Sequence, residues 1–204
     1  WYYYKVTALN GDLKSKPATS VEVCVGSSLS LPYHNGLSTS ASMEDFTIVD
    51  ANDDGSTWSF DGNYNMVAYT ANSSNAADDW FITPPINMKK GAAYKFSFDA
   101  VNDYPTERVA AAVGTDATAE AMTDIVIEPT EVTYQPRRRT LSGTFRATED
   151  GMRYFGIHAI SDADCNHLYV DNLNITEVSA SAPDSPTDLV VTPGEKGATT
   201  AALC

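Results

Sequence analysis

Lysine and arginine are missing from the whole interval between Lys16 and Lys89 of this 204-residue chain. The net charge is -14 at pH 7, and the one basic cluster is Arg137 to Arg139. A nucleic-acid partner is therefore not expected, because phosphate binding needs a basic surface. Acidic residues that the fold brings together in the basic-free interval would repel one another unless a cation offsets them. They are Glu22, Glu44, Asp45, Asp50, Asp53, Asp54, Asp61, Asp78 and Asp79.

Cysteines are also scarce. Cys24, Cys165 and Cys204 leave at least one thiol unpaired, so they give no disulfide framework. The sequence shows no signal peptide and no membrane-spanning run, and we expect no membrane insertion of this segment. The motifs of serine hydrolases, zinc peptidases and phosphate-binding loops are missing too, so we expect no enzyme. A pair of catalytic carboxylates of the glycosidase type would leave no such motif, because the fold and not the sequence spacing sets the distance between the two groups.

What the chain does contain favours β-structure. Tyrosine, phenylalanine, threonine and valine are abundant, and long helical patterns are few. In the clearest amphipathic strand, Tyr94, Phe96, Phe98 and Ala100 alternate with polar residues. Eight or more strands at regular spacing between residues 27 and 179 predict an all-β, two-sheet jelly-roll sandwich. The other expected strands lie at 46–49, 58–70, 80–86, 109–113, 125–127, 139–146, 152–160 and 167–178.

An acidic loop precedes Trp58. Asp50, Asn52 and Asp54 place oxygen-bearing side chains at every second residue, Gly55 permits a sharp turn, and Asp61 follows eleven residues after Asp50. This spacing is typical of calcium loops, in which alternate oxygens converge on a hard cation. The flanks look like strands and not like the helices of an EF-hand. The loop is therefore either a Ca²⁺ site or a solvated acidic turn.

The last expected strand adds another candidate ligand. Strict alternation would put Asp171 on one face with His167, Tyr169, Leu173 and Ile175. An unpaired carboxylate among apolar side chains is costly, so Asp171 is expected to find a cation or strong donors. We expect it to contribute to a calcium site together with a residue of the entry segment, for which Glu44 is the best candidate.

Both ends of the chain resemble fragments of fibronectin type III modules. Tyr2, Tyr4, Val6 and Ala8 fill the pattern of the penultimate strand of such a module. Pro183, Pro186, Leu189 and Val191 match the opening of a following one. The resemblance implies three parts: residues 1–26 as the last two strands of one module, 27–179 as the jelly-roll domain, and 180–204 as the first strands of the next. We expect contacts with these neighbouring modules.

The central part resembles the cleaved-adhesin, or choice-of-anchor J type, domains of gingipain-like bacterial proteins. The similarity lies in four segments in the family's order: 46–58, 79–85, 94–98 and Tyr169-Val-Asp-Asn-Leu173. It implies structural calcium, an extracellular or bacterial cell-surface location, and adhesion without catalysis. One departure is the acidic loop, where Asn52 and Asp53 replace the usual Asp-Gly.

Several residues could contact a ligand. The aromatic rings of Trp58, Trp80, Tyr104 and Tyr134 could stack on a sugar, with core packing as the alternative for the two tryptophans. Arg138 and its neighbours could bind an anionic group or balance acidic residues of the domain itself. The sequence thus predicts a calcium-stabilised adhesion module for a host or environmental protein or glycan. The alternatives are a structural spacer without a ligand and an accessory domain of a secreted protease or glycosidase.

Overall fold

The computed structural model describes residues 28–103, 106–133 and 138–178, with short pieces at 5–6, 9–10, 13–16, 18–19, 191–192 and 202–203. The short pieces are the two-residue strands β1 (Lys5–Val6), β2 (Leu9–Asn10), β3 (Leu13–Lys14), β4 (Ala18–Thr19), β17 (Val191–Thr192) and β18 (Ala202–Leu203), with Ser15 and Lys16. β1 pairs with β4, β2 with β3, and β17 with β18. Most of the two predicted fibronectin-like fragments lies outside the described residues.

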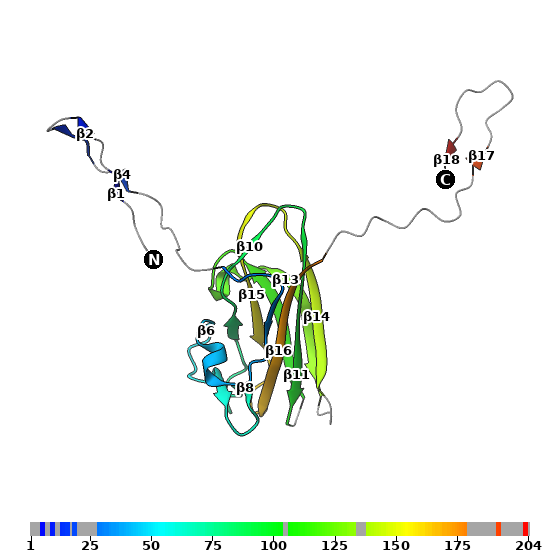
Figure 1. Ribbon diagram of the computed structural model, residues 1–204. Helices are drawn as coiled ribbons and strands as arrows, with labels where there is room; N and C mark the ends of the chain where they lie inside the picture. The colour runs from blue at the N-terminus through cyan, green and yellow to red at the C-terminus, as the bar shows by residue number, and fades with distance from the viewer. Residues whose placement is uncertain are drawn as a thin grey trace.

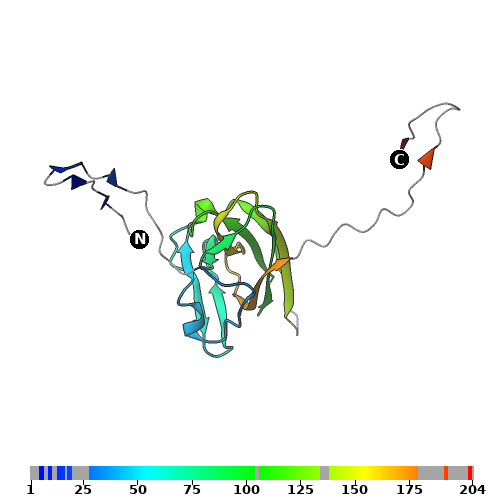
Figure 2. The ribbon, with the colours of Figure 1, turned by 45° about the horizontal axis from the view of Figure 1, so that its top comes forward.

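The central domain is a sandwich of two antiparallel sheets, seen as two layers in Figures 1 and 2, as the sequence predicted. The first sheet has the order β13 (Asp124–Val132), β12 (Glu107–Gly114), β15 (Gly151–Ala159), β9 (Asp79–Ile82) and β6 (Thr47–Asp50), and β10 (Ile86–Met88) also pairs with β15. The second sheet has the order β14 (Arg139–Arg146), β11 (Ala93–Asn102), β16 (His167–Val178), β8 (Met66–Thr70) and β7 (Trp58–Asp61), and β5 (Tyr33–Asn35) also pairs with β16.

Alternating side chains of both sheets form the core between the layers. The predicted inward residues of β11, Tyr94, Phe96, Phe98 and Ala100, are all buried there. Phe96 stacks on Phe155 of β15 with ring centroids 4.7 Å apart, and this contact joins the two sheets. The aromatic pattern read from the sequence therefore gives the correct inner face of the central strands.

The alternation of β16 breaks at Asn172, and one prediction was wrong for this reason. Asn172 has a φ of 48°, and the register with β11 shifts at Ser97 and Asp99. Such a bulge moves the following residues to the other face. Leu173 and Ile175 therefore point into the core, whereas Asp171 lies on the outer face of the sheet together with Tyr169.

The two sheets approach each other closely along one side, where β13 meets β14. Gly143 makes this possible, since a methyl group there would lie 1.7 Å from the carbonyl oxygen of Val126. On the opposite side the outermost strands are β6 and β7, and the acidic loop (residues 50–57) connects them. The loop thus bridges the two layers at the edge away from Gly143.

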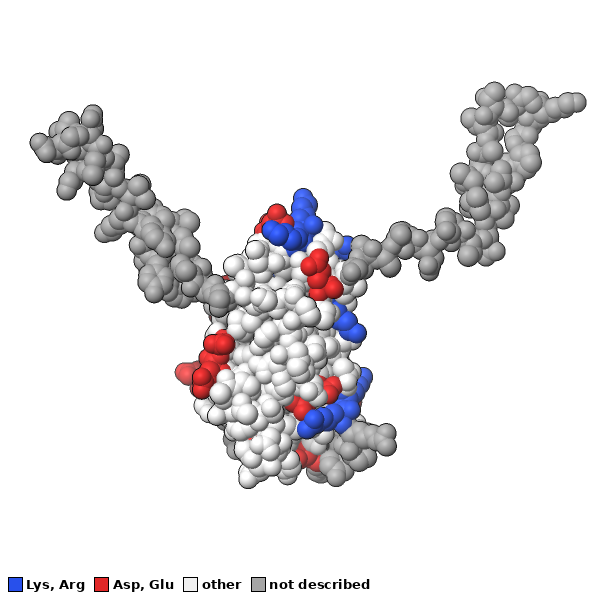
Figure 3. All heavy atoms as spheres, in the orientation of Figure 1, with Lys and Arg blue, Asp and Glu red and all other residues white. Residues whose placement is uncertain are grey.

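Helical structure in the described ranges is limited to two 3₁₀ turns, η1 (Ser40–Met43) and η2 (Ala119–Ala121). No helix in this part of the chain is long and apolar enough to cross a membrane. On the face of the domain turned to the viewer in Figure 3, charged side chains lie at the margins and the centre is uncharged.

Candidate functional site

The acidic loop is held by hydrogen bonds among its own residues. The carboxylate of Asp50 accepts from the backbone N–H groups of Asp54 and Gly55, at 3.2 and 2.9 Å. The amide nitrogen of Asn52 donates to Asp54 Oδ2 at 3.2 Å and to the carbonyl oxygen of Ala76 at 2.7 Å. Gly55 has a φ of 80°, the conformation that the predicted sharp turn requires. The loop is well defined, with side chains that partly satisfy each other.

The residues predicted to bind calcium do not converge in one place. Asp61 accepts from the N–H group of Asn63 at 2.8 Å in the turn between β7 and β8, and Glu44 is exposed at the end of η1. Among the described residues, no three His, Cys, Asp or Glu side chains gather in a way that could hold a metal ion. A cation in this domain would need further oxygen ligands from the backbone or from water.

Asp171 has a protein partner, which is Arg138. Their side chains form an ion pair at 2.5 Å, and the Asp171 side chain is only 6% exposed. Burial raises the pKa of the Asp171 carboxyl, whereas the guanidinium of Arg138 lowers it. Arg138 therefore balances an acidic group of the domain, one of the two roles that the sequence left open. Tyr104 and Tyr134 lie outside the described residues.

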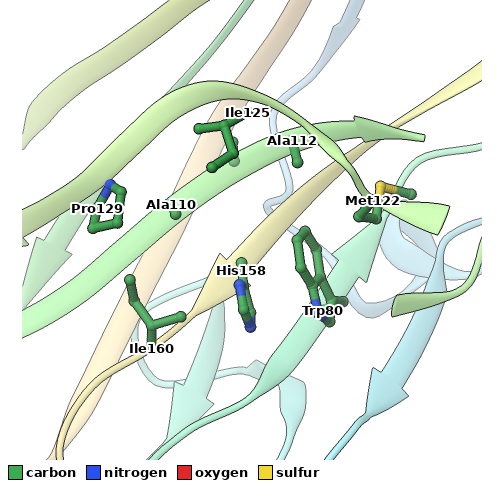
Figure 4. Close-up of a pocket in the computed structure, with 9 residues that line it drawn as sticks. Trp80, Ala110, Ala112, Met122, Ile125, Pro129, His158 and Ile160 are labelled. Carbon is green, nitrogen blue, oxygen red and sulfur yellow. The ribbon is translucent and has the colours of Figure 1, made fainter. Parts of the chain in front are cut away.

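A pocket of about 270 Å³ lies on the outer face of the first sheet. Figure 4 shows its two walls: Trp80 and His158 on one side, and the overhanging β13 with Ile125 and Pro129 on the other. The remaining lining residues are Ala110, Ala111, Ala112, Met122 and Ile160. The small alanines of β12 form the floor, so the hollow exists because large side chains are missing there.

Trp80 and His158 bring polar chemistry to this apolar pocket. Their rings stack with centroids 3.9 Å apart, as cross-strand neighbours of β9 and β15. His158 Nε2 lies 2.7 Å from Asp78 Oδ1, and the Asp78 side chain is 52% exposed. Burial lowers the pKa of His158 despite the nearby carboxylate, so the ring is neutral near pH 7. The pocket offers a mostly apolar surface with the imidazole of His158 in its wall, and that imidazole is paired with the half-exposed carboxylate of Asp78.

A second feature lies behind the acidic loop. The side chain of Asp79 is fully buried and points into the core with Phe81, while its neighbour Trp80 points outward. Burial raises the pKa of Asp79 to about 6, although the nearby Thr57 hydroxyl lowers it in part. Glu107 of β12 is fully buried as well.

Sequence reasoning named Trp80 as a possible sugar contact but missed the pocket around it. It also missed the buried carboxylates, although a signal for them was present. Asp79 alternates with Phe81, and Glu107 alternates with Val109 and Ala111. Since alternate residues of a strand point to the same face, this pattern places both carboxylates on the inner face. The pocket left no such signal, because it depends on the position of β13 above the alanines of β12.

No protein-family model matches the sequence, and no curated protein matches it significantly. Solved structures do resemble the fold. The K1 cleaved adhesin domain of Lys-gingipain from Porphyromonas gingivalis superposes with a TM-score of 0.56 at 16% identity, over 72% of this chain and 98% of that one. The K3 cleaved adhesin domain of the same protein gives 0.51 at 16% identity, over 65% and 91%.

A CBM22-1 xylan-binding domain from Paenibacillus barcinonensis gives a TM-score of 0.51 at 14% identity, over 73% of this chain and 95% of that one. At such low identity these similarities show the fold alone. The central domain has the two-sheet β-sandwich fold of cleaved adhesin domains and of a xylan-binding domain.

Proposed function

We propose that this chain is a non-catalytic, extracellular binding module of a bacterial multidomain protein, and that its ligand is a glycan. The observation that carries the proposal is the pocket between Trp80, His158 and the overhanging β13. The pocket is concave and mostly apolar, and a few polar groups stand at its edge, the combination typical of small-ligand sites.

A sugar ring suits this combination. Its C–H groups can pack against the side chains of Trp80, Met122 and Ile160, all of which line the pocket. Its hydroxyl groups can donate to the carboxylate of Asp78, which is half exposed. A volume of about 270 Å³ gives room for a ring-sized group and not for a folded segment of a partner protein.

The fold supports the proposal without deciding it. One similar structure is described as a xylan-binding domain and two as cleaved adhesin domains of a bacterial protein. The sequence has no serine-hydrolase, zinc-peptidase or phosphate-loop motif, which agrees with a binding role. An extracellular or cell-surface location follows from the same likeness and belongs to the proposal.

We further propose that calcium stabilises the domain. The donors near the acidic loop are carboxylate, amide and hydroxyl oxygens, the ligands that Ca²⁺ prefers. Because the loop side chains already form hydrogen bonds with one another and with the loop backbone, Asp50, Asn52 and Asp54 would support a site more readily than form one alone. Buried oxygen atoms behind the loop are better placed as ligands.

Two other functions make different predictions. A structural spacer would bind no ligand and would use its surfaces for neighbouring modules. An accessory domain of a secreted protease or glycosidase would bind the substrate of a catalytic domain elsewhere in the parent protein. The pocket argues against the spacer, and it is compatible with an accessory domain that binds a glycan.

A glycan-array screen of the full 204-residue chain, run with calcium and then with chelator, tests the proposal. Isothermal titration with any hit then compares Asp78→Asn and Ile125→Ser with the unchanged chain. Both variants should weaken binding at least tenfold, because Ile125 lines the pocket and Asp78 holds the lining residue His158.

Tyr64→Ser is the matched control. Tyr64 and Ile125 are each 58% exposed, and Tyr64 lies in the β7–β8 turn of the second sheet, against Tyr169 of β16. Its loss should leave binding unchanged. A screen without hits would favour the spacer, and loss of binding in Tyr64→Ser alone would move the site to the other sheet.

A further inference from the structure

The floor of the pocket consists of small side chains that the strand register brings into two rows. Ala110 of β12 pairs with His158 of β15, and Ala112 of β12 pairs with Gly156 of β15. The indole of Trp80 lies over Gly156, since a methyl group there would be 2.8 Å from Cε3 of the ring. The two alanines therefore lie at the bottom of a hollow that has large side chains on both sides.

The lining of this hollow offers few polar groups to a ligand. Apart from the indole nitrogen of Trp80, its only side-chain nitrogen or oxygen atoms among the described residues are those of His158. The strand that carries the floor, β12, is paired with β13 and with β15, so its backbone polar groups are used largely in the two ladders. A sugar hydroxyl pressed against the floor would leave water without gaining a partner, which is unfavourable. An ordinary hexose therefore suits the edge of the pocket better than its floor.

His158 supplies one hydrogen-bond acceptor in the wall of the pocket. Figure 4 shows its imidazole between Trp80 and Ile160. The ring is neutral near pH 7, because burial lowers its pKa. Nε2 carries the proton, since it lies 2.7 Å from the carboxylate of Asp78 and an ionised carboxylate can only accept. Nδ1 is then an acceptor, and it has no hydrogen-bond partner among the described residues.

We infer that the pocket recognises a sugar by a methyl group, which packs on Ala110 and Ala112 while a neighbouring N–H or O–H group of the sugar donates to His158. Two kinds of sugar share this chemistry. An N-acetylhexosamine carries its methyl in an acetamido group with an N–H donor, and a 6-deoxyhexose carries a methyl at C6 beside a hydroxyl. The inference rests on the proposed function, because it names the ligand class of the same pocket.

Other occupants use only part of the pocket. A hexose without a methyl group places a hydroxyl on the alanine floor and leaves that hydroxyl unpaired. An apolar side chain of a partner protein covers the floor but brings no donor to Nδ1 of His158. A methyl-bearing sugar satisfies both, and its remaining hydroxyl groups stay at the edge of the pocket, where the carboxylate of Asp78 is half exposed.

Two matched pairs of sugars test the inference on the full chain. Tri-N-acetylchitotriose and cellotriose have the same backbone and differ in the acetamido or hydroxyl group at C2. L-Fucose and L-galactose differ only in the hydroxyl group at C6. In isothermal titration the methyl-bearing member of one pair should bind at least about tenfold more tightly, because a buried hydroxyl without a partner costs at least that factor. The pair that shows the preference identifies the source of the methyl group.

A substitution in the floor tests where the methyl group lies. Ala110→Ser adds a hydroxyl group to the floor and should reduce the preference within the pair severalfold. Ala68→Ser is the matched control, because Ala68 is a buried alanine on the outer face of the second sheet, next to Tyr169. This variant should keep the preference of the unchanged chain. An unaltered preference in Ala110→Ser, or its loss in Ala68→Ser alone, would overturn the inference.

The outcomes separate this inference from the proposed function. Equal binding of both members in both pairs, or tighter binding of the members without the methyl group, would overturn the inference and keep a glycan-binding pocket. Array hits confined to sugars without an acetamido or 6-deoxy group would do the same. Failure of every sugar to bind, in the titrations and on the array, would overturn both.

Discussion

Asp78 and Asp79 are consecutive residues whose carboxylates stand on opposite sides of the first sheet. The Asp78 carboxylate reaches the outer face and lies 2.7 Å from His158 Nε2, while the Asp79 side chain is fully buried between the layers. Successive side chains of a strand point to opposite faces, so one short segment contributes both a partner of the pocket residue His158 and a buried carboxylate in the core. Substitutions at the two positions should therefore have separable effects.

The first prediction concerns Asp79 in chelator. Its pKa in the folded protein is about 6, above the ordinary value of 3.8. As pH falls, the carboxylate of Asp79 is therefore protonated at a higher pH in the folded protein than in the unfolded chain. The contribution of Asp79 to stability should rise as pH falls from 7 through 6, and the shift corresponds to roughly 3 kcal/mol. Asp79→Asn lacks the buried charge and should be more stable than the unchanged chain at pH 7.5, with a gap that closes near pH 4.

Urea unfolding in chelator at a series of pH values measures this gap. The difference between the two proteins also cancels the opposite effect of His158, whose lowered pKa makes the fold less stable as pH falls below its ordinary value. A pH-independent gap would contradict the raised pKa of Asp79.

The second prediction uses Gly156 to move a wall of the pocket. A methyl group at this position would lie 2.8 Å from Cε3 of Trp80, so Gly156→Ala must displace the indole. We expect a stability loss of about 1–3 kcal/mol and a change in tryptophan fluorescence. Glycan binding, once a ligand is known, should weaken at least tenfold. At Gly62 the nearest atom to such a methyl is 3.9 Å away, so Gly62→Ala should change neither property.

The third prediction concerns the ion pair on the outer face of the second sheet. Arg138→Ala leaves the carboxylate of Asp171 buried without its partner and should destabilise the domain by about 1–3 kcal/mol. Adding Asp171→Asn should recover part of this loss, since it removes the unpaired charge. The exposed side chain of Arg139 donates to the carbonyl oxygen of Glu131 at 3.1 Å and, in the described part of the chain, forms no ion pair. Thermal unfolding of Arg139→Ala should therefore differ little from that of the unchanged chain.

The fourth prediction concerns the closed side of the sandwich. Gly143→Ala would place a methyl group 1.7 Å from the carbonyl oxygen of Val126, and backbone atoms cannot move aside as a side chain can. The expected loss is at least about 3 kcal/mol, measured by urea unfolding. Gly36→Ala is the control, because the nearest atom there is Ser38 Oγ at 3.7 Å. Equal stability of the two variants would show that β13 and β14 separate easily.

Most of the fold could be predicted from the alternation of apolar and polar residues in the sequence. The strand over 139–146 matches β14, that over 167–178 matches β16, and Phe155, Ile157 and Ala159 point inward as expected. The bulge at Asn172 carried no visible signal, because an asparagine in a strand does not by itself indicate a positive φ. That one residue was enough to reverse the predicted face of Asp171 relative to Leu173.

Less of the candidate site could be predicted. The acidic loop stood out because local spacing encodes the convergence of its side chains, and the structure shows a compact turn there. The buried carboxylates Asp79 and Glu107 come from β9 and β12, and the pocket joins β9, β12, β13 and β15. Such groupings depend on the order of strands in each sheet, which one sequence without relatives does not reveal.

The pairing of β5 with β16 also determines how the domain would respond to mechanical force. Tyr33, where β5 begins, lies opposite Ile175, close to the point where β16 ends. Tension applied through the preceding and following segments would thus act at the same end of this antiparallel pair and open its three residue pairs one after another. β5 would separate from β16 at low force while the rest of the sandwich stayed folded. A domain pulled from both ends would therefore lengthen before its pocket was lost.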